Sequence, residues 1–585
     1  MKFTPLRGIV FTVLVSLLLL CDRTAAQTPL EPSQMPSRTS FYLIWRGTPA
    51  PEARKANSLL ALWDDPDFAP VRAAMFENMM NSSEKDAAKQ KLTGEEIEKY
   101  SALLDNALVL GYISKPEAKM TATAVPPKSA EPPWNGLFLV YNRTGKESLL
   151  SEAVLRMRSQ DKDLPQLSQI TVAGVPVLKV ERKTATTYWV EHGKYAASAG
   201  ERSVLEELLV RLEGKSPGAA SLAQSAAYQE AQPLLGGGLL EFFVRVSNLK
   251  SLVPDASASG LKVAPVLDAM KLEALHSLCG RVVLDGAKTR FQGALLGAVA
   301  PGTLFDLWSA GQPAPASLSL VSPNDVSYSE TQFNLPAFYE MLKRSITAAL
   351  PPGQQGSANM MEGLAQNRLG MPVSDALGLL SGDFASVQSS PTLDPQKAVY
   401  VLGIRKKPET LKLLRTIFSD QLSSERSEGD VTFLKISLGG GQGNAGVVQF
   451  NFYHLAVTPD FVLGASRAET LHEFLAARSH SSPVSALGAV ARFQTARAAY
   501  PEKLDGLNYL DFQKVDWQAL KTRWVEEARK VSEKQSTGGT PKTTPAKVPS
   551  LLNDANPQVF PRHLHFMAGA AWKDPKGIHF DQWLE

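Results

Sequence analysis

The feature that most constrains the fold is a sequence pattern that occurs twice. The residues from Lys194 to Leu209 and from Asp460 to Leu475 each combine a short apolar stretch, a turn of small residues and a helix with one apolar face. In the first copy the leucines lie three and four residues apart, which is the spacing of one helical face. A pattern that recurs within one chain indicates a structural unit used twice.

The similarity continues on both sides of this pattern. The aligned pairs are Leu137 with Val399 (offset 262), Tyr195 with Phe461 (266), Gly238 with Gly506 (268), and Gly280, Asp285 and Phe291 with Gly569, Asp574 and Phe580 (289). The offset grows where the second half carries extra loop residues, around 439–446 and 532–549. We therefore expect the two halves to superpose.

Both halves mix helical and strand patterns without the regular alternation of a parallel α/β fold. We expect an α+β protein made of two tandem repeats, each a mainly antiparallel sheet with amphipathic helices packed on it. The repeats are predicted at 38–300 and 317–585, with a linker at 301–316. A disordered insertion near 532–549, rich in Lys, Thr and Pro, is expected within the second repeat.

Individual elements can be placed from local periodicity. Strands are expected at Phe41–Trp45 and Leu240–Val246, and a hairpin is expected from Val175–Glu181 and Thr187–His192. Helices are expected at the following ranges: Asn57–Trp63, Phe68–Met80, Glu95–Leu110 and Glu147–Met157.

The first 26 residues have the features of a signal peptide. Lys2 and Arg7 precede an apolar run from Ile9 to Leu20, and Ala26 ends a small-residue cleavage site. The mature chain is expected to begin with a flexible lead-in at 27–37 and to be periplasmic or extracellular. No later stretch reaches the roughly 18 consecutive apolar residues of a membrane helix, so no integral span is expected after cleavage.

Lipoprotein anchoring at Cys21 is the lesser alternative, because Leu20 is not the small residue that such a signal requires. After cleavage at Ala26 the remaining cysteine is Cys279, which excludes an intramolecular disulfide. Its apolar surroundings, LHSLCGRVVL, predict a buried and inert strand cysteine.

The charge balance argues against a polyanionic partner. The chain has 61 basic and 58 acidic residues, a formal net charge of +3. Nucleic-acid-binding domains carry a stronger basic excess. We expect no nucleic acid among the partners.

An exported leader, two such halves and the segment from Ala376 to Ala385 (ALGLLSGDFA) resemble a family of exported bacterial two-repeat proteins catalogued only as a domain of unknown function. The resemblance covers most of the mature chain through loose patterns of apolar residues, glycine and acid. It implies an α+β fold and an exported location. It brings no catalytic residues with it.

Three histidines near the end of the chain are the candidate metal ligands. His563 and His565 would point to one face of an extended strand, and the paired strand would bring His579 nearby. Three imidazoles can hold a zinc ion. The simpler interpretation, a solvated strand face, is favoured because carboxylate support for the rings is missing: the nearby acids are Asp574 and Asp581, and the hairpin turn should keep Asp574 away from a site beside His563.

No other motif supplies a coherent catalytic set. We predict no catalytic residues and no cofactor. The expected function is a non-catalytic binding or assembly module of the cell envelope, with a protein or another envelope component as partner. The alternative is an exported hydrolase, metal-assisted through His563, His565 and His579.

Overall fold

The computed structural model describes residues 31–72, 99–100, 102–114, 136–159, 166–181, 186–215, 220–247, 263–308, 316–350, 352–354, 356–437, 454–479, 487–523, 525–526 and 556–585. The predicted signal peptide, Cys21, part of the predicted linker and the predicted insertion at 532–549 lie outside these residues. Within them, no helix is long and apolar enough to cross a membrane.

The chain divides into two compact units. Unit 1 comprises Met1–Leu252, His276–Leu296 and Val525–Val559, and unit 2 comprises Val253–Leu275, Gly297–Trp524 and Phe560–Glu585. The predicted boundaries differ from these at 253–275, at 297–316 and at 525–559. The segment 253–275 belongs to unit 2, because helix α9 (Val263–Ala269) packs against α10 (Leu335–Ala349).

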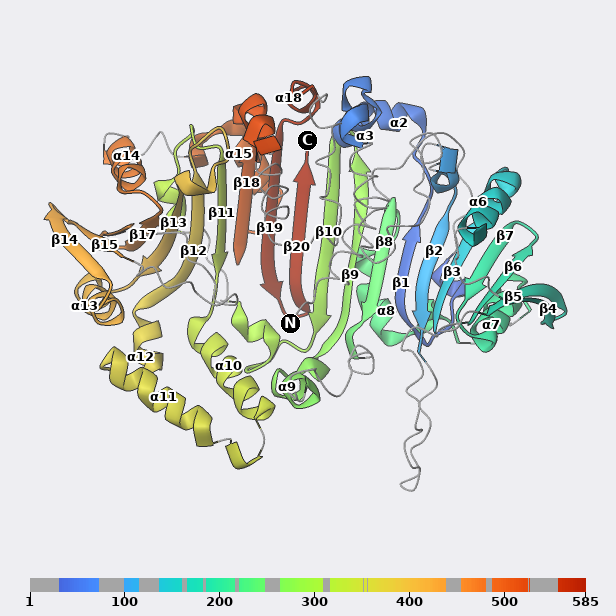
Figure 1. The fold of residues 1–585 in the computed structure, drawn as a ribbon, viewed down its shortest axis with the longest axis horizontal. Helices are drawn as coiled ribbons and strands as arrows, with labels where there is room; N and C mark the ends of the chain where they lie inside the picture. The colour runs from blue at the N-terminus through green and yellow to red at the C-terminus, as the bar shows by residue number, and fades with distance from the viewer. Residues whose placement is uncertain are drawn as a thin grey trace, which may run out of the picture. The chain divides into compact units, whose positions relative to one another are not determined.

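Unit 1 contains one sheet whose strands follow the spatial order β4-β5-β6-β7-β3-β2-β1-β8-β9-β10 (Figure 1). All pairings from β4 to β9 are antiparallel. The strands are β1 (Thr39–Trp45), β2 (Leu108–Ile113), β3 (Leu137–Asn142), β4 (Gln166–Val172), β5 (Val175–Glu181), β6 (Thr186–His192), β7 (Tyr195–Ala199), β8 (Leu240–Arg245), β9 (Leu275–Asp285) and β10 (Lys288–Gly297).

Unit 2 contains a sheet with the order β14-β15-β16-β17-β13-β12-β11-β18-β19-β20, and all of these pairings are antiparallel. Adding ten to each strand number of unit 1 gives this order. The strands are β11 (Ser327–Gln332), β12 (Leu380–Gln388), β13 (Ala398–Ile404), β14 (Leu422–Glu428), β15 (Val431–Ile436), β16 (His454–Val457), β17 (Phe461–Ala465), β18 (Gly506–Asp511), β19 (Phe566–Asp574) and β20 (Gly577–Leu584).

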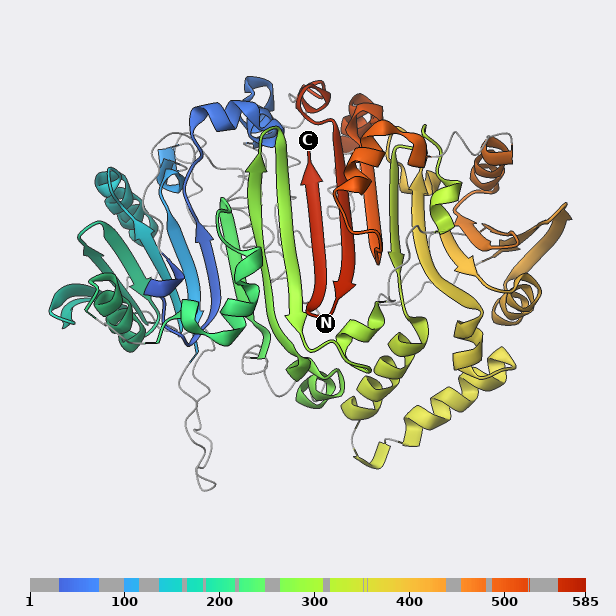
Figure 2. The same ribbon diagram turned by 180° about the vertical axis from the view of Figure 1, so that it is seen from behind.

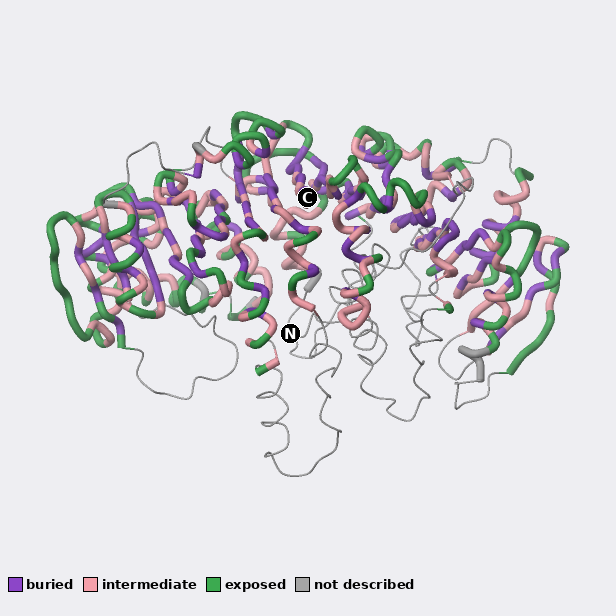
Figure 3. Tube along the Cα trace, turned by 90° about the horizontal axis from the view of Figure 1, so that it is seen from above, coloured by how far each residue is buried: buried purple, intermediate pink, exposed green. Residues whose placement is uncertain are grey.

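In chain order, the helices of unit 1 lie in the connections between its strands (Figure 2). In α7, the leucines predicted to share one face are buried: Leu205, Leu208 and Leu209 pack with Val140 and Val190 of the sheet. The helices of this unit are α2 (Pro51–Ala56), α3 (Ser58–Asp64), α6 (Glu147–Ser159), α7 (Arg202–Leu212) and α8 (Ala226–Ala231). Buried residues concentrate in the strands (Figure 3).

Unit 2 buries its core in the same way. Leu471 and Phe474 of α14 pack with Val401 and Leu463 of the sheet. Its helices, besides α9 and α10, include α11 (Gly356–Leu369), α12 (Val373–Gly378), α13 (Lys407–Ile417), α14 (Ala468–Ser479), α15 (Ala491–Ala498) and α18 (Val559–His563). The α+β class predicted from the sequence is confirmed.

The strand registers show that some predicted alignments are incompatible with each other. Tyr195 and Phe461 begin β7 and β17, and their partners are Asn142 and Gly403, which gives an offset of 261 (403 − 142). An alignment of Tyr195 with Phe461 therefore places Leu137 on Ala398, one residue before the predicted Val399. Likewise the partners of Gly280 and Gly569 are Phe242 and Asn508, an offset of 266 (508 − 242). An alignment of Gly280 with Gly569 therefore places Gly506 on Leu240 and not on Gly238.

Three elements differ from the sequence predictions. The helix predicted at Glu95–Leu110 does not reach Leu110, because β2 begins at Leu108 and buries alternate residues. Strand β4 was not predicted. The lead-in is ordered from Glu31, since Met35 is fully buried and its carbonyl accepts a hydrogen bond from Leu222 N at 2.8 Å.

The edge strands of the two sheets differ in charge. In the described residues β4 pairs only with β5, and β14 pairs only with β15. Strand β4 reads QLSQITV and has no charged residue, whereas β14 reads LSSERSE and has three. Charged side chains are a common protection of edge strands against pairing with other chains.

Candidate functional site

The three candidate histidines do not come together at one site. His563 ends the short helix α18, so the extended strand predicted for His563 and His565 is wrong. His565 lies just before β19, where its N–H donates to Glu585 O at 2.6 Å. His579 lies in β20 opposite Trp572, near the turn of the same hairpin. Nine strand residues at about 3.3 Å each separate the two ends of β19, so one ion cannot bind to His565 and His579 together.

His579 has a local partner instead. Its Nε2 atom is 3.1 Å from Asp574 Oδ1, and its ring stacks on Trp572 with centroids 5.5 Å apart. Asp574 was expected to lie away from a site beside His563, and it does, because both Asp574 and His579 are at the other end of the hairpin. Within the described residues, no group of three or more His, Cys, Asp or Glu side chains is arranged to hold a metal ion.

Cys279 lies in β9 and is fully buried. Burial raises the pKa of its thiol to about 12, so the reactive thiolate is scarce at neutral pH. This is the inert strand position that its apolar neighbours predict.

The most unusual group of titratable residues is a cluster of buried carboxyl groups in unit 2, which the sequence analysis missed. Glu330 of β11 is 3% exposed, Asp383 of β12 is 4% exposed, and Asp505, which precedes β18, is 1% exposed. Glu330 and Gln332 lie on one face of β11, and Gln332 pairs with Asp383. The cluster therefore occupies the core face of the sheet, at one end.

Glu330 retains its proton at neutral pH in this environment. Burial raises its pKa to about 8, and repulsion from Asp383 and Asp505 adds to the effect of burial, while a hydrogen bond with Gln332 opposes it. Burial also raises the pKa of Asp383. A buried carboxyl group without a cation is more stable when neutral. Because these groups are almost completely buried, they are suited to a structural role rather than to contact with a substrate.

In unit 1 a buried glutamate is paired with a cation instead of keeping its proton. Glu241 of β8 is 2% exposed and accepts hydrogen bonds from Arg46 Nη2 at 3.0 Å and Nε at 3.2 Å. Gly238 N also donates to it at 3.0 Å. The guanidinium group neutralises this carboxylate within the fold.

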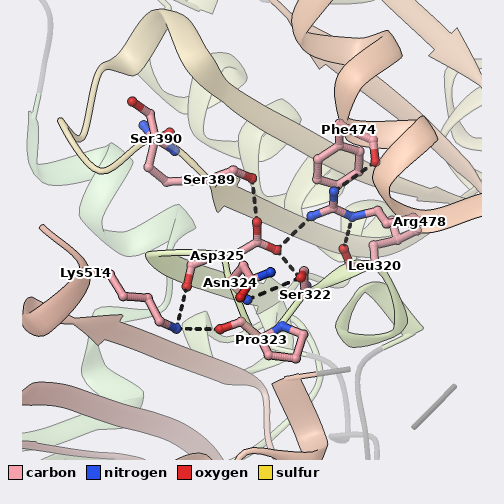
Figure 4. A network of polar contacts seen from close by, with 11 residues as sticks. Leu320, Ser322, Pro323, Asn324, Asp325, Ser389, Ser390, Phe474, Arg478 and Lys514 are labelled. Atoms are coloured by element: carbon pink, nitrogen blue, oxygen red, sulfur yellow. Dashed lines mark hydrogen bonds and ion pairs between the residues drawn. The ribbon is translucent and has the colours of Figure 1, made fainter. Parts of the chain in front are cut away.

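A second buried network joins four segments of unit 2 (Figure 4). Asp325, 3% exposed, pairs with Arg478 Nη2 at 2.7 Å and accepts hydrogen bonds from Ser322 N and Ser389 Oγ. Lys514 Nζ donates to the backbone carbonyls of Pro323 and Asp325. These contacts hold the loop before β11 against α14, the end of β12 and the end of β18.

Arg478 is the centre of this network. Its other nitrogens donate to the carbonyls of Leu320 and Phe474, and its guanidinium carbon lies 3.3 Å from the centroid of the Phe474 ring. Burial lowers the pKa of Arg478, although attraction to Asp325 opposes this effect. These contacts are all internal to unit 2, so the network stabilises the unit.

Exposed apolar residues form the clearest surface feature of unit 2. Phe338, Leu342 and Ile346 lie four residues apart on α10, and Met360, Met361 and Leu364 lie on α11; we call these six residues the α10–α11 apolar surface. The α10 residues are between 39% and 44% exposed and the α11 residues between 61% and 64%. The two helices are joined by Tyr339 Oη and Lys343 Nζ, which contact Glu362 at 2.9 and 2.7 Å.

Comparisons with known proteins do not identify a family for the chain. No family model and no curated protein matches the chain. The chain is similar to two solved structures described as crystal forms I and III of TP0453, with 8% identity to each. The matches cover 46% and 47% of this chain and 80% and 82% of the other, with TM-scores of 0.21 and 0.17. These scores are too low to support a conclusion about fold or function.

Proposed function

We propose that the chain is a non-catalytic binding or assembly module of the cell envelope, exported and built from two tandem repeats. The observation that supports binding is the α10–α11 apolar surface. Met360, Met361 and Leu364, each at least 61% exposed, lie together on the side of α11 away from Glu362, and exposed apolar patches commonly mark interaction sites.

The composition of this surface favours a protein partner. Met360 and Met361 are flexible and polarisable, which suits a contact surface that adapts to another protein. Helices that lie on anionic membranes carry many basic residues on the polar face. The sequence of α11, GSANMMEGLAQNRL, has one basic and one acidic residue, so it lacks that basic face. An apolar helix or groove of another protein fits better.

Site-specific photo-crosslinking in intact cells tests this proposal. A photo-reactive phenylalanine analogue at Met361 should give one discrete protein adduct. The matched control is the same analogue at Leu155 of α6, which has nearly the same exposure, 63% against 61%. We expect the adduct from a probe at Leu364 to weaken when Met360 and Met361 are both replaced by Ser. Equal adducts from Leu155, or adducts to lipid alone, would contradict the proposal.

The tandem repeat is supported by the identical strand order of the two units. A common loop-to-helix contact adds to this, because Leu222 N donates to Met35 O in unit 1 and Leu487 N donates to Val321 O in unit 2. Superposition of experimental structures of the units should place Tyr195 on Phe461. A fit that aligns other strands better would refute the duplication.

Export is supported by the charged start, the apolar run and the cleavage site of the first 26 residues. N-terminal sequencing of the mature protein should begin at Gln27 or within a few residues of it. Envelope material that still carries Lys2 would contradict export with cleavage. The metal-assisted hydrolase has lost its support, because His563, His565 and His579 lie apart.

A further inference from the structure

Unit 1 has a small cavity beneath the pattern with which the sequence analysis began. The cavity has a volume of about 210 Å³ and lies between the β6–β7 hairpin and the end of α7. Val190 and Ala197, which pair with each other across the hairpin, form its apolar floor together with Leu209 of α7. All three are buried, so the floor belongs to the core of the unit.

The rim of the cavity is polar. His192 Nε2 lies 2.8 Å from Glu213 Oε1, and Lys215 Nζ lies 2.7 Å from Glu213 Oε2. Glu213 is thus already paired with two basic groups. The pKa of Glu213 is lowered by these contacts, first by the hydrogen bond from Lys215, so it remains ionised.

Lys194 is the basic group at the rim that remains available. Its Nζ atom lies 5.2 Å from the centroid of the Tyr195 ring, and no described carboxylate is within ion-pair distance of it. The end of α7 does not compete for it, because the last carbonyls already accept bonds from Gly214 N and Lys215 N. Among the lining residues, Glu213 is therefore already paired, and Lys194 is the ammonium group that can meet an anion.

In unit 2, larger side chains occupy the positions that correspond to lining residues of the cavity in unit 1. The strand order and register make Leu463 equivalent to Ala197, since these residues pair with Val401 and Val140. Leu463 is fully buried. Leu212, which lines the cavity, corresponds to Arg478. Arg478 pairs with Asp325 in the internal network described above. The cavity of unit 1 therefore arises from residues that have changed between the two halves.

We propose that this cavity binds a small monocarboxylate whose body is a single aromatic ring or a short branched alkyl group. An apolar cavity of about 150 Å³ can already hold a benzene ring, so this one accommodates a ring and its substituent. The body lies against Tyr195 and Leu212, the partly exposed lining side chains above the buried Val190, Ala197 and Leu209, and the carboxylate reaches Lys194 at the rim. Few polar groups at the edge of an apolar cavity are the usual arrangement of a ligand site. This site goes beyond the proposed partner-binding function and does not depend on it.

Benzoate is the probe, because its ring and carboxylate match the two parts of the site. Saturation-transfer NMR with the full chain should detect its ring protons, and titration should give weaker binding for benzyl alcohol and none for acetate. Ala197→Leu, which introduces the residue of unit 2, should abolish the signal. Lys194→Met should weaken binding about threefold to fivefold, as expected for an exposed ion pair.

Two controls separate binding from folding. Lys503→Met removes an exposed lysine of unit 2 and should leave the benzoate affinity unchanged. The thermal unfolding of Lys194→Met should match that of the unmodified chain, since Lys194 is exposed. Benzoate binding that survives Ala197→Leu, or equal affinities for benzoate and benzyl alcohol, would overturn the proposal. So would the absence of any signal from benzoate with the unmodified chain.

Discussion

Glu241 of unit 1 and Glu330 of unit 2 occupy the same level of two sheets that have the same strand order. They lie on different strands of that order, because Glu241 is on β8 and Glu330 is on β11, which has the place of β1. Glu241 of β8 is opposite Ile44 of β1, whereas Glu330 of β11 is opposite Leu507 of β18. Each row follows a pair of aromatic residues, Tyr42 with Phe243 in unit 1 and Tyr328 with Tyr509 in unit 2. The first glutamate is neutralised by Arg46, and the second is neutralised by its own proton.

Glu330→Gln should make the protein more stable at alkaline pH. In the folded chain the pKa of Glu330 is about 8, against an ordinary value of 4.5. Between these values only the folded state keeps the proton, so stability falls as the pH rises from about 4.5 to 8. The loss is at most about 5 kcal/mol, because one pKa unit is worth about 1.4 kcal/mol. Thermal melts of the variant and the unmodified chain should agree at pH 4 and diverge at pH 9. Melts that remain parallel across this range would disprove the assignment.

Arg46→Met should destabilise unit 1, because it leaves Glu241 buried without a cation. Removal of one partner of a buried pair costs about 3–5 kcal/mol. Arg46 is 22% exposed in its side chain, so we expect a value near or below the lower limit. Urea unfolding measures the loss. The double variant Arg46→Met with Glu241→Gln should recover most of it, and a double variant no better than the single one would contradict the charge argument.

Arg478→Leu introduces into unit 2 the residue that the proposed repeat places at the same position of unit 1, Leu212. The substitution leaves Asp325 buried and removes the hydrogen bonds to Leu320 and Phe474, so a loss of about 3 kcal/mol or more is expected. Arg478→Lys retains the charge but cannot make the same set of bonds, and it should fall between the two. Chemical denaturation should rank the variants in this order. Equal stability of Arg478→Leu and the unmodified chain would show that the network is dispensable.

Cys279 should resist alkylation in the folded protein. With Cys21 replaced by Ser, iodoacetamide at pH 8 should leave the folded chain unmodified and should label it once in urea. The reason is the combination of full burial and a thiol pKa near 12. Rapid labelling without denaturant would show that β9 opens easily.

Much of the fold can be predicted from periodicity. β7 and α7 follow from an apolar stretch and from leucines on one helical face, and both are where they were expected. β4 could not be found in this way, because all but its last residue are at least partly exposed. Without a buried face a strand has no alternating pattern in its sequence.

The buried acids were missed for the opposite reason. In β11, SYSETQ, alternation suggests a strand, but the residues at the buried positions include Glu330 and Gln332. Polar residues are normally assigned to the exposed face, so pattern alone inverts this strand. The alignment of Leu137 is ambiguous by one residue for a related reason, since Leu137–Val140 and Val399–Leu402 are apolar throughout and match in either register. Only the pairing with β7 and β17 distinguishes the two registers.

The unequal edges of the two sheets limit how copies of this chain could polymerise. A strand can be added readily beside β4, which has no charge, but the charges of β14 oppose addition there. Growth of a filament needs two compatible edges per chain, one for each neighbour, whereas a symmetric pair uses one. A crowded or partly unfolded preparation should therefore accumulate closed dimers through β4 before it forms fibres. The three charged residues of β14 thus disfavour the strand addition that fibre growth would need at this edge.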